Sequence, residues 1–231
     1  MKKQHAHDYS PKTMDALEEI ENLKISGQHQ ESIKKAQLLL CDDPNCVAAL
    51  EEIADNHVSL DEFEKARKAA EHALKLDKSS YTAYYILGFI ESHFRRWPAS
   101  VRYLARANEL HANNPEILRC LGWSTFNSGK RTQGIIILER ALNLDPENSL
   151  TLCDLGVCYL QAKQFDKSIE LLKKALEIDP DNKRVQECYQ AAKNFSKRFS
   201  ELGASVPLLA QRNVRNFNRP VTDFKDHLIL Y

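Results

Sequence analysis

The chain has 231 residues, of which 43% are hydrophobic and 28% are charged, and its 32 basic and 32 acidic residues give a formal net charge of zero. Balanced charge offers no global attraction to nucleic acid or to an acidic membrane surface. No apolar run approaches the roughly 18 residues that span a bilayer, and the polar start of the chain lacks a signal peptide's apolar stretch. These features predict a folded cytoplasmic protein without a membrane span.

Five consecutive units of 34 residues follow a polar segment, residues 1–12, that we expect to be flexible. The units share one register without insertions and comprise residues 13–46, 47–80, 81–114, 115–148 and 149–182. Leu-Gly recurs at a single offset, as Leu87-Gly88, Leu121-Gly122 and Leu155-Gly156. A fixed period of this size predicts a stack of similar supersecondary units, each burying its apolar face against its neighbours.

Each unit is predicted to be a helix, a tight turn and an antiparallel helix. In the fifth unit the first apolar face holds Leu152, Leu155, Gly156 and Tyr159, and the second holds Ile169, Leu172, Ala175 and Leu176. Pro180 follows because the residue before a proline resists the α conformation. Gly27 and Gly129 share the turn offset, where a left-handed residue favours glycine. Gly88, Gly122 and Gly156 are expected to let the partner helix approach closely.

These units resemble tetratricopeptide repeats. The matching residues are Leu152, Leu155-Gly156, Tyr159, Ala175 and Pro180 in the fifth unit, and Leu118, Leu121-Gly122, Ala141 and Pro146 in the fourth. Earlier units depart from the pattern, since Glu91 and Ala54 replace the usual tyrosine and glycine. The resemblance implies an all-α fold, a right-handed superhelical solenoid of antiparallel helix pairs that binds other proteins, with very different partners across the family.

Two further segments follow the repeats. Residues 183–203 keep an apolar helical face with a polar opposite side, which predicts a capping helix that ends at Gly203. Residues 204–231 are too apolar for an ordinary solvated tail, so we expect them to dock on the repeats or on a partner, a frayed terminus being the alternative. The candidate docking residues are Leu208, Leu209, Phe217, Phe224, Leu228, Ile229 and Tyr231. Three arginines in this tail are too few to indicate nucleic acid binding in a neutral protein.

The concave face of such a solenoid is the expected binding surface, lined by the second, fifth, ninth and twelfth residues of each first helix. The candidate peptide-binding residues are Tyr85, Phe89, Arg119, Trp123, Phe126, Cys153, Val157 and Leu160. Glu21, Glu51 and Asp55 make the other end of the groove acidic. Exposed aromatic side chains would mark an interaction site, although the same residues could pack between helices. Arg119 is a candidate to hold a ligand carboxylate or backbone carbonyl.

One partner class can be tested from the sequence. Some tetratricopeptide repeat proteins hold the C-terminal carboxylate of heat-shock chaperones with a clamp of Lys, Asn, Asn, Lys and Arg. The matching offsets here hold Leu17, Glu21, Glu52, Thr82 and Ile86. Acidic residues would repel a carboxylate, so the sequence argues against this partner class.

Catalytic motifs are missing from the sequence, including a Gly-rich phosphate loop, His-Glu-x-x-His and Gly-x-Ser-x-Gly. The six cysteines lack zinc-site spacing and are expected to be reduced thiols, so no cofactor or metal is expected. The sequence predicts a non-enzymatic scaffold or adaptor, chaperone-like, that binds an apolar peptide or helix in the groove. A bacterial secretion-type chaperone and a self-assembling scaffold with tail-mediated association remain the alternatives.

Overall fold

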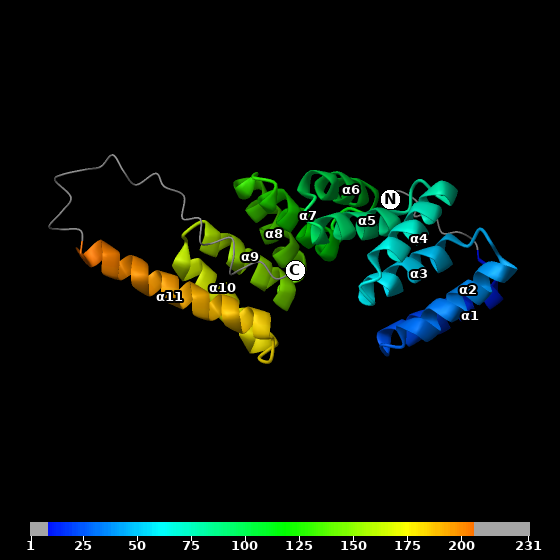
Figure 1. Ribbon diagram of the computed structural model, residues 1–231, viewed down its shortest axis with the longest axis horizontal. Coiled ribbons are helices and arrows are strands. Elements are labelled where there is room, and N and C mark those ends of the chain that lie inside the picture. Colours follow the sequence, from blue (N-terminus) through cyan, green and yellow to red (C-terminus); the bar gives the residue numbers. More distant parts are fainter. Residues whose placement is uncertain (1–8, 206–231) are drawn as a thin grey trace. The chain divides into compact units, whose positions relative to one another are not determined.

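The computed structural model describes the backbone of residues 9–205 and the side chains of residues 9–201. These residues form eleven α-helices and no strand, so the all-α prediction is confirmed (Figure 1). The helices are α1 (Pro11–Ile25), α2 (His29–Asp42), α3 (Val47–Ser59), α4 (Phe63–Leu76), α5 (Tyr81–His93), α6 (Trp97–Leu110), α7 (Pro115–Asn127), α8 (Arg131–Leu144), α9 (Ser149–Gln161), α10 (Phe165–Ile178) and α11 (Lys183–Ser205).

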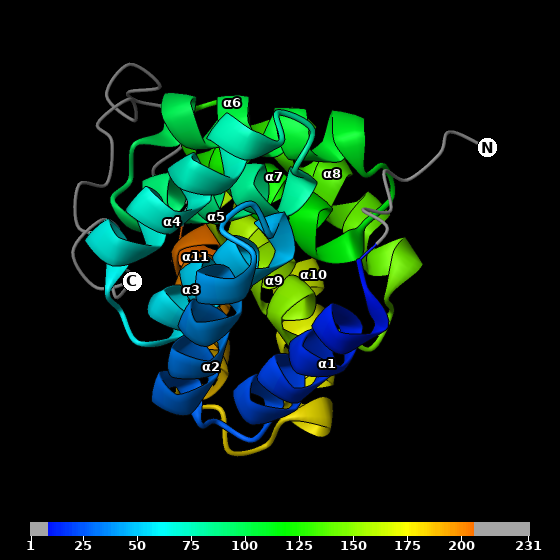
Figure 2. The same ribbon diagram turned by 90° about the vertical axis from the view of Figure 1, so that its right-hand side faces the viewer.

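The helices recur with the period of the sequence. The first helices of successive pairs begin at Val47, Tyr81, Pro115, Ser149 and Lys183, which are 34 residues apart, and the second helices keep the same spacing. The members of a pair contact each other and run antiparallel, as α3 with α4 and α5 with α6 show (Figures 1 and 2). The resemblance to a helix-pair repeat therefore holds at the level of single elements.

The turn inside each pair contains one residue with positive φ, always at the same offset. These residues are Gly27, Asp61, Arg95, Gly129 and Lys163, with φ of 75°, 57°, 56°, 99° and 60°. The left-handed glycines are confirmed, and three repeats place a residue with a side chain in the same conformation, which costs roughly 1–2 kcal/mol. Two backbone bonds compensate by satisfying the last carbonyls of the first helix. In the third pair Arg95 N–H donates to Ser92 O at 2.9 Å and Arg96 N–H to Glu91 O at 2.8 Å.

Small residues let paired helices approach closely. A Cβ on Gly88 would lie 2.5 Å from Leu104 Cγ, and one on Gly156 would lie 2.8 Å from Leu172 Cγ. Ser100 Oγ donates to the Gly88 carbonyl at 2.8 Å across the same interface. The predicted packing reason for these glycines is confirmed, because no methyl group fits without displacing the partner helix.

The chain divides into two compact units, Met1–Cys120 and Leu121–Tyr231, and the boundary falls within α7. The core of the first unit contains Ile20, Ala36, Leu39, Cys46, Ala49 and Ile53, and next to them Leu50, Ala54, Ala66, Ala70, Ile86, Leu87 and Ile90. The core of the second unit contains Phe126, Leu138, Leu155 and Cys158, followed by Leu152, Leu160, Leu172, Val185 and Ala192.

Both ends of the described chain differ from expectation. Helix α1 begins at Pro11, where proline suits a first helical position, and Ser10 Oγ accepts a hydrogen bond from Thr13 N–H at 3.2 Å. Tyr9 Oη also accepts from Ala48 N–H at 3.2 Å, so residues 9–12 belong to the folded first unit rather than to a flexible segment. Helix α11 passes Gly203 and ends at Ser205. A helical glycine costs only about 1 kcal/mol, whereas Val206 precedes a proline and resists the α conformation.

Candidate functional site

Two aromatic side chains form one face of α5 in the first unit. Tyr85 and Phe89 are four residues apart, both half-buried, with ring centroids 6.4 Å apart. Tyr85 Oη donates a hydrogen bond to Glu116 Oε1 at 2.9 Å, which fixes its ring against the start of α7. Burial, together with the neighbouring Cys120 and Glu116, raises the pKa of Tyr85, so the hydroxyl remains a donor. Phe89 has no polar atom and therefore offers the apolar part of this face.

Arg119 is held by an internal carboxylate. Its Nε lies 2.8 Å from Glu116 Oε2 and its Nη2 lies 2.6 Å from Glu116 Oε1, a bidentate arrangement, and its side chain is 13% exposed. Burial opposes ionisation of Glu116, but the hydrogen bond and charge of Arg119 outweigh it and keep the Glu116 pKa below its usual range. A ligand carboxylate at this position would have to compete with Glu116, which the sequence prediction did not include.

The acidic end of the predicted groove is mostly used for contacts between helices. Lys24 Nζ of α1 lies 2.7 Å from Glu52 Oε2 and 3.0 Å from Asp55 Oδ2 of α3. Ser80 Oγ, at the start of α5, donates to Glu51 Oε1 at 2.5 Å. Burial raises the pKa of Glu51, although the hydrogen bond from Ser80 partly opposes this shift. Glu21 is exposed, so it alone of the three predicted acidic residues remains an ordinary surface charge.

The candidate residues of the second unit lie mainly in its core. Phe126, Cys153, Val157 and Leu160 are 2%, 2%, 3% and 0% exposed, whereas Trp123 is half-buried. Helix α9 contacts α8, α10 and α11, and every residue from 151 to 160 is buried. These four side chains therefore pack between helices instead of facing an open groove, because three helices surround α9 where the repeat pattern alone suggested one free face.

A buried ion pair was missed by the sequence reasoning. Glu91 is 4% exposed, and its Oε1 lies 2.5 Å from Arg67 Nη2 and 3.7 Å from Arg96 Nη1. Glu91 stands where the fifth unit has Tyr159, so the departure from the repeat pattern was the available signal. The pair joins α4 to α5 and stabilises the first unit internally.

The predicted tail-docking residues, Leu208, Leu209, Phe217, Phe224, Leu228, Ile229 and Tyr231, lie outside the described residues. All six cysteines lie within the described range and are free thiols. Within residues 9–205 no helix is both long enough and apolar enough to cross a membrane.

Comparisons with known proteins agree with the helix-pair architecture. Residues 51–115 and 149–182 each match a tetratricopeptide repeat family. Anaphase-promoting complex subunit 3 of Schizosaccharomyces pombe is 23% identical over 142 residues, 62% of this chain and 21% of that protein. BBSome complex member BBS4 of Bos taurus is 27% identical over 139 residues, 60% of this chain and 26% of that protein. This chain thus matches about a quarter of the length of these relatives.

The fold also resembles a solved repeat protein. The crystal structure of the APC/C hetero-tetramer Cut9-Hcn1 superposes with a TM-score of 0.74 at 20% identity, covering 80% of this chain and 37% of that chain. Similarity at this identity concerns the fold. With helix pairs that recur every 34 residues, left-handed turns at one offset and two matched segments, the chain is a tetratricopeptide repeat protein.

Proposed function

We propose that this protein is a non-enzymatic scaffold or adaptor that binds an apolar peptide or helix of a partner protein. The observation that carries the proposal is the aromatic face of α5, where Tyr85 and Phe89 lie side by side and remain half-buried. A partner side chain covering this face would remove more apolar surface from water, worth roughly 1.5–3 kcal/mol per anchor before ordering costs.

Trp123 is a second candidate anchor in the other unit, because it also remains half-buried while its neighbours are covered. Phe126, Cys153, Val157 and Leu160 are left out of the proposed surface on account of their burial. The proposed ligand is therefore recognised by a few aromatic contacts, a pattern typical of interaction hot spots.

A role inside a larger assembly is supported by similarity, since the relatives' names describe members of the anaphase-promoting complex and the BBSome. We propose a comparable role as one subunit among several for this chain. A cytoplasmic location is supported by the six free thiols, which suit a reducing compartment.

The test is selection of binding peptides from a random displayed library, followed by affinity measurement with variants. We expect the selected peptides to carry apolar anchors and Phe89→Ala to weaken binding by at least tenfold. Phe94→Ala is the matched control, because Phe94 is 43% exposed at the end of the same helix but points into a different cluster with Phe63. Failure to select any peptide, or equal binding by the Phe89→Ala protein, would contradict the proposal.

A further inference from the structure

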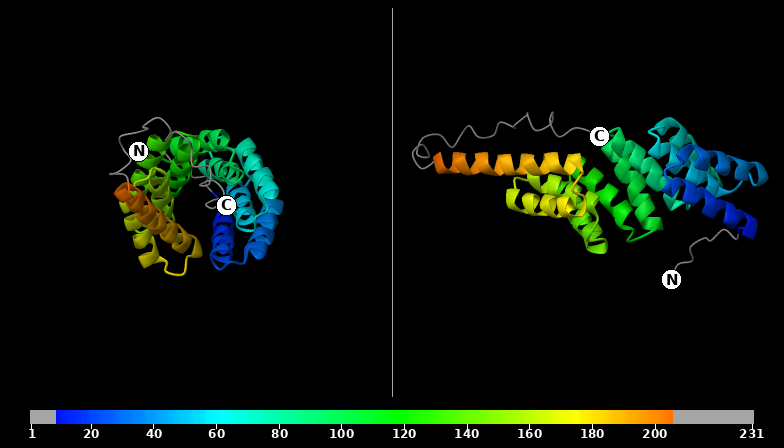
Figure 3. Two further views of the ribbon diagram at one scale, coloured as in Figure 1. Left: turned by 60° about the vertical axis from the view of Figure 1, so that its left-hand side comes forward. Right: turned by 90° about the horizontal axis from the view of Figure 1, so that it is seen from below.

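The last helix extends well beyond the helix pair that it covers. Helix α11 has 23 residues, whereas α9 has 13, and its C-terminal end projects past α10 (Figure 3). Phe199 lies on this projecting part and is 54% exposed. An aromatic side chain left this open at the edge of a folded unit indicates a surface that another segment covers.

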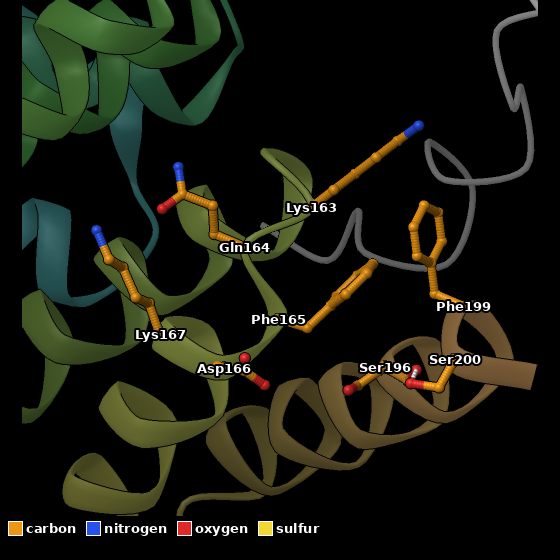
Figure 4. A pocket seen from close by; sticks show the side chains of 8 residues that line it. All are labelled: Lys163, Gln164, Phe165, Asp166, Lys167, Ser196, Phe199 and Ser200. Carbon is orange, nitrogen blue, oxygen red and sulfur yellow. Dashed lines mark hydrogen bonds between the residues drawn. The ribbon is translucent and has the colours of Figure 1, made fainter. Parts of the chain in front are cut away.

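A pocket of 420 Å³ lies beside Phe199, between the start of α10 and α11. It is lined by Lys163, Gln164, Phe165, Asp166, Lys167, Ser196, Phe199 and Ser200 (Figure 4). The rings of Phe165 and Phe199 point toward each other, with centroids 5.4 Å apart. The size lies within the range of pockets that hold small ligands or a few side chains.

The polar groups around the pocket already have partners among its own residues. Lys163 Nζ lies 5.9 Å from the Phe199 ring centroid, and Lys167 Nζ lies 5.0 Å from the ring centroid of Tyr159. Ser200 Oγ donates to Ser196 O at 2.9 Å. What remains for an occupant is the apolar surface of Phe165 and Phe199, so the pocket suits a neutral, apolar segment.

We propose that the segment Val206–Leu209 of this chain folds back and fills the pocket. This segment reads Val-Pro-Leu-Leu, has no charge, and follows directly after the last residue of α11. Six helical residues separate Phe199 from Ser205, an axial distance of about 9 Å, and four extended residues reach about 13 Å. A reversal at Pro207 therefore brings Leu208 and Leu209 within reach of the Phe199 ring.

Proximity along the chain favours this occupant over a separate molecule. A short connection gives an effective concentration near millimolar, and closing a short loop orders few residues. The contact also covers the exposed aromatic ring without a partner protein. It involves α10 and α11 alone, so it is independent of the proposed peptide surface on α5.

Hydrogen–deuterium exchange of the full chain, followed by mass spectrometry, tests this contact. We compare the unchanged chain with Leu208→Asn/Leu209→Asn, in which asparagine removes the apolar side chains without adding a charge that the lysines would attract. Exchange in residues 163–167 and 196–201 is expected to rise several-fold. The matched control is Leu228→Asn/Ile229→Asn, which makes a comparable change further along and is expected to leave exchange unaltered.

A second variant, Phe199→Ala, removes the pocket side of the same contact. We expect it to raise exchange in residues 163–167 to the level of the Leu208→Asn/Leu209→Asn protein, with no further rise when the changes are combined. Equal exchange in the unchanged chain and the Leu208→Asn/Leu209→Asn protein would overturn the proposal. So would protection that increases with protein concentration, because that result assigns the pocket to a second copy.

Discussion

Replacing Gly134 with alanine separates helix propensity from packing, because the two effects have opposite signs. Gly134 lies in α8, where alanine would favour the helix by about 1 kcal/mol if no neighbour interfered. A Cβ at this position would lie 2.5 Å from Phe126 N and 2.7 Å from Gly122 O, both backbone atoms of α7. Ordinary contact needs roughly 3.5 Å, so the helices would have to separate by about 1 Å.

The expected result is a net loss of stability. Overpacking of a close helix contact costs about 1–3 kcal/mol, and backbone atoms cannot move aside as a side chain can. After the gain in helix propensity, Gly134→Ala should destabilise the second unit by about 1–2 kcal/mol. Gly156→Ala is the matched control, since its Cβ would meet side-chain atoms of Leu172, at 2.8 Å and 3.1 Å, which can rearrange. Its effect should stay within about 1 kcal/mol of zero.

Urea unfolding followed by the fluorescence of Trp123 measures both variants, because Trp123 packs against the core of the second unit. A loss of 1–2 kcal/mol corresponds to a midpoint shift of about 0.5–1 M for an ordinary denaturant slope. A Gly134→Ala protein that is more stable than the unchanged chain by about 1 kcal/mol would refute the packing argument and leave helix propensity as the sole effect.

Three further predictions concern single sites of the first unit. Burial raises the pKa of Glu51, so its ionised form destabilises the fold once the pH rises above the unfolded value of about 4.3, and Glu51→Gln should stabilise the protein more at pH 7 than at pH 4 in urea titrations. The pKa of Glu116 is lowered mainly by Arg119 against the effect of burial, so Glu116→Gln should destabilise at pH 7, and the difference should vanish as the pH falls below about 4. Arg95→Gly should raise stability by about 0.5–1 kcal/mol in thermal unfolding, because φ there is 56°. Glu91→Leu should cost about 3 kcal/mol by leaving Arg67 unpaired, and Arg67→Met in the same chain should recover most of that loss; additive losses would contradict this account.

The fold could be read from the sequence because every repeat encodes it again. The Leu-Gly pairs, the apolar faces and the closing prolines predict helix pairs, and the close approach at Gly88 and Gly156 follows from them. The left-handed residues Asp61, Arg95 and Lys163 were not identified, since no glycine marks them. Their offset from Gly27 and Gly129 held the information, because a backbone conformation set by two hydrogen bonds recurs whatever side chain is present.

The candidate site was less predictable, because periodicity says which residues share a helix face but not how many helices cover that face. Cys153 and Val157 lie on the expected side of α9, yet neighbouring helices bury them. Arg119 and Glu116 are three residues apart, so their ion pair could have been expected from helix geometry. The contact of Tyr85 with Glu116 joins two repeats, and the period alone does not specify such a pairing.

The departures from the repeat explain why α11 does not begin a sixth helix pair. In α9 the residues that face the second helix of the pair are Leu152, Leu155, Gly156 and Tyr159, and the corresponding residues of α11 are Gln186, Tyr189, Gln190 and Lys193. Of the α11 residues, Gln186, Gln190 and Lys193 are exposed, so this side gives an eleventh-position lysine and two amides where a partner helix would need apolar contacts. The other side of α11, with Val185 and Cys188 buried against the second unit, keeps the repeat pattern. A helix that is apolar on one side only can close a stack, and no turn forces α11 to stop where the other first helices do. Its extra length is therefore a direct result of losing the pair partner, and the same loss leaves Phe199 exposed beside Phe165.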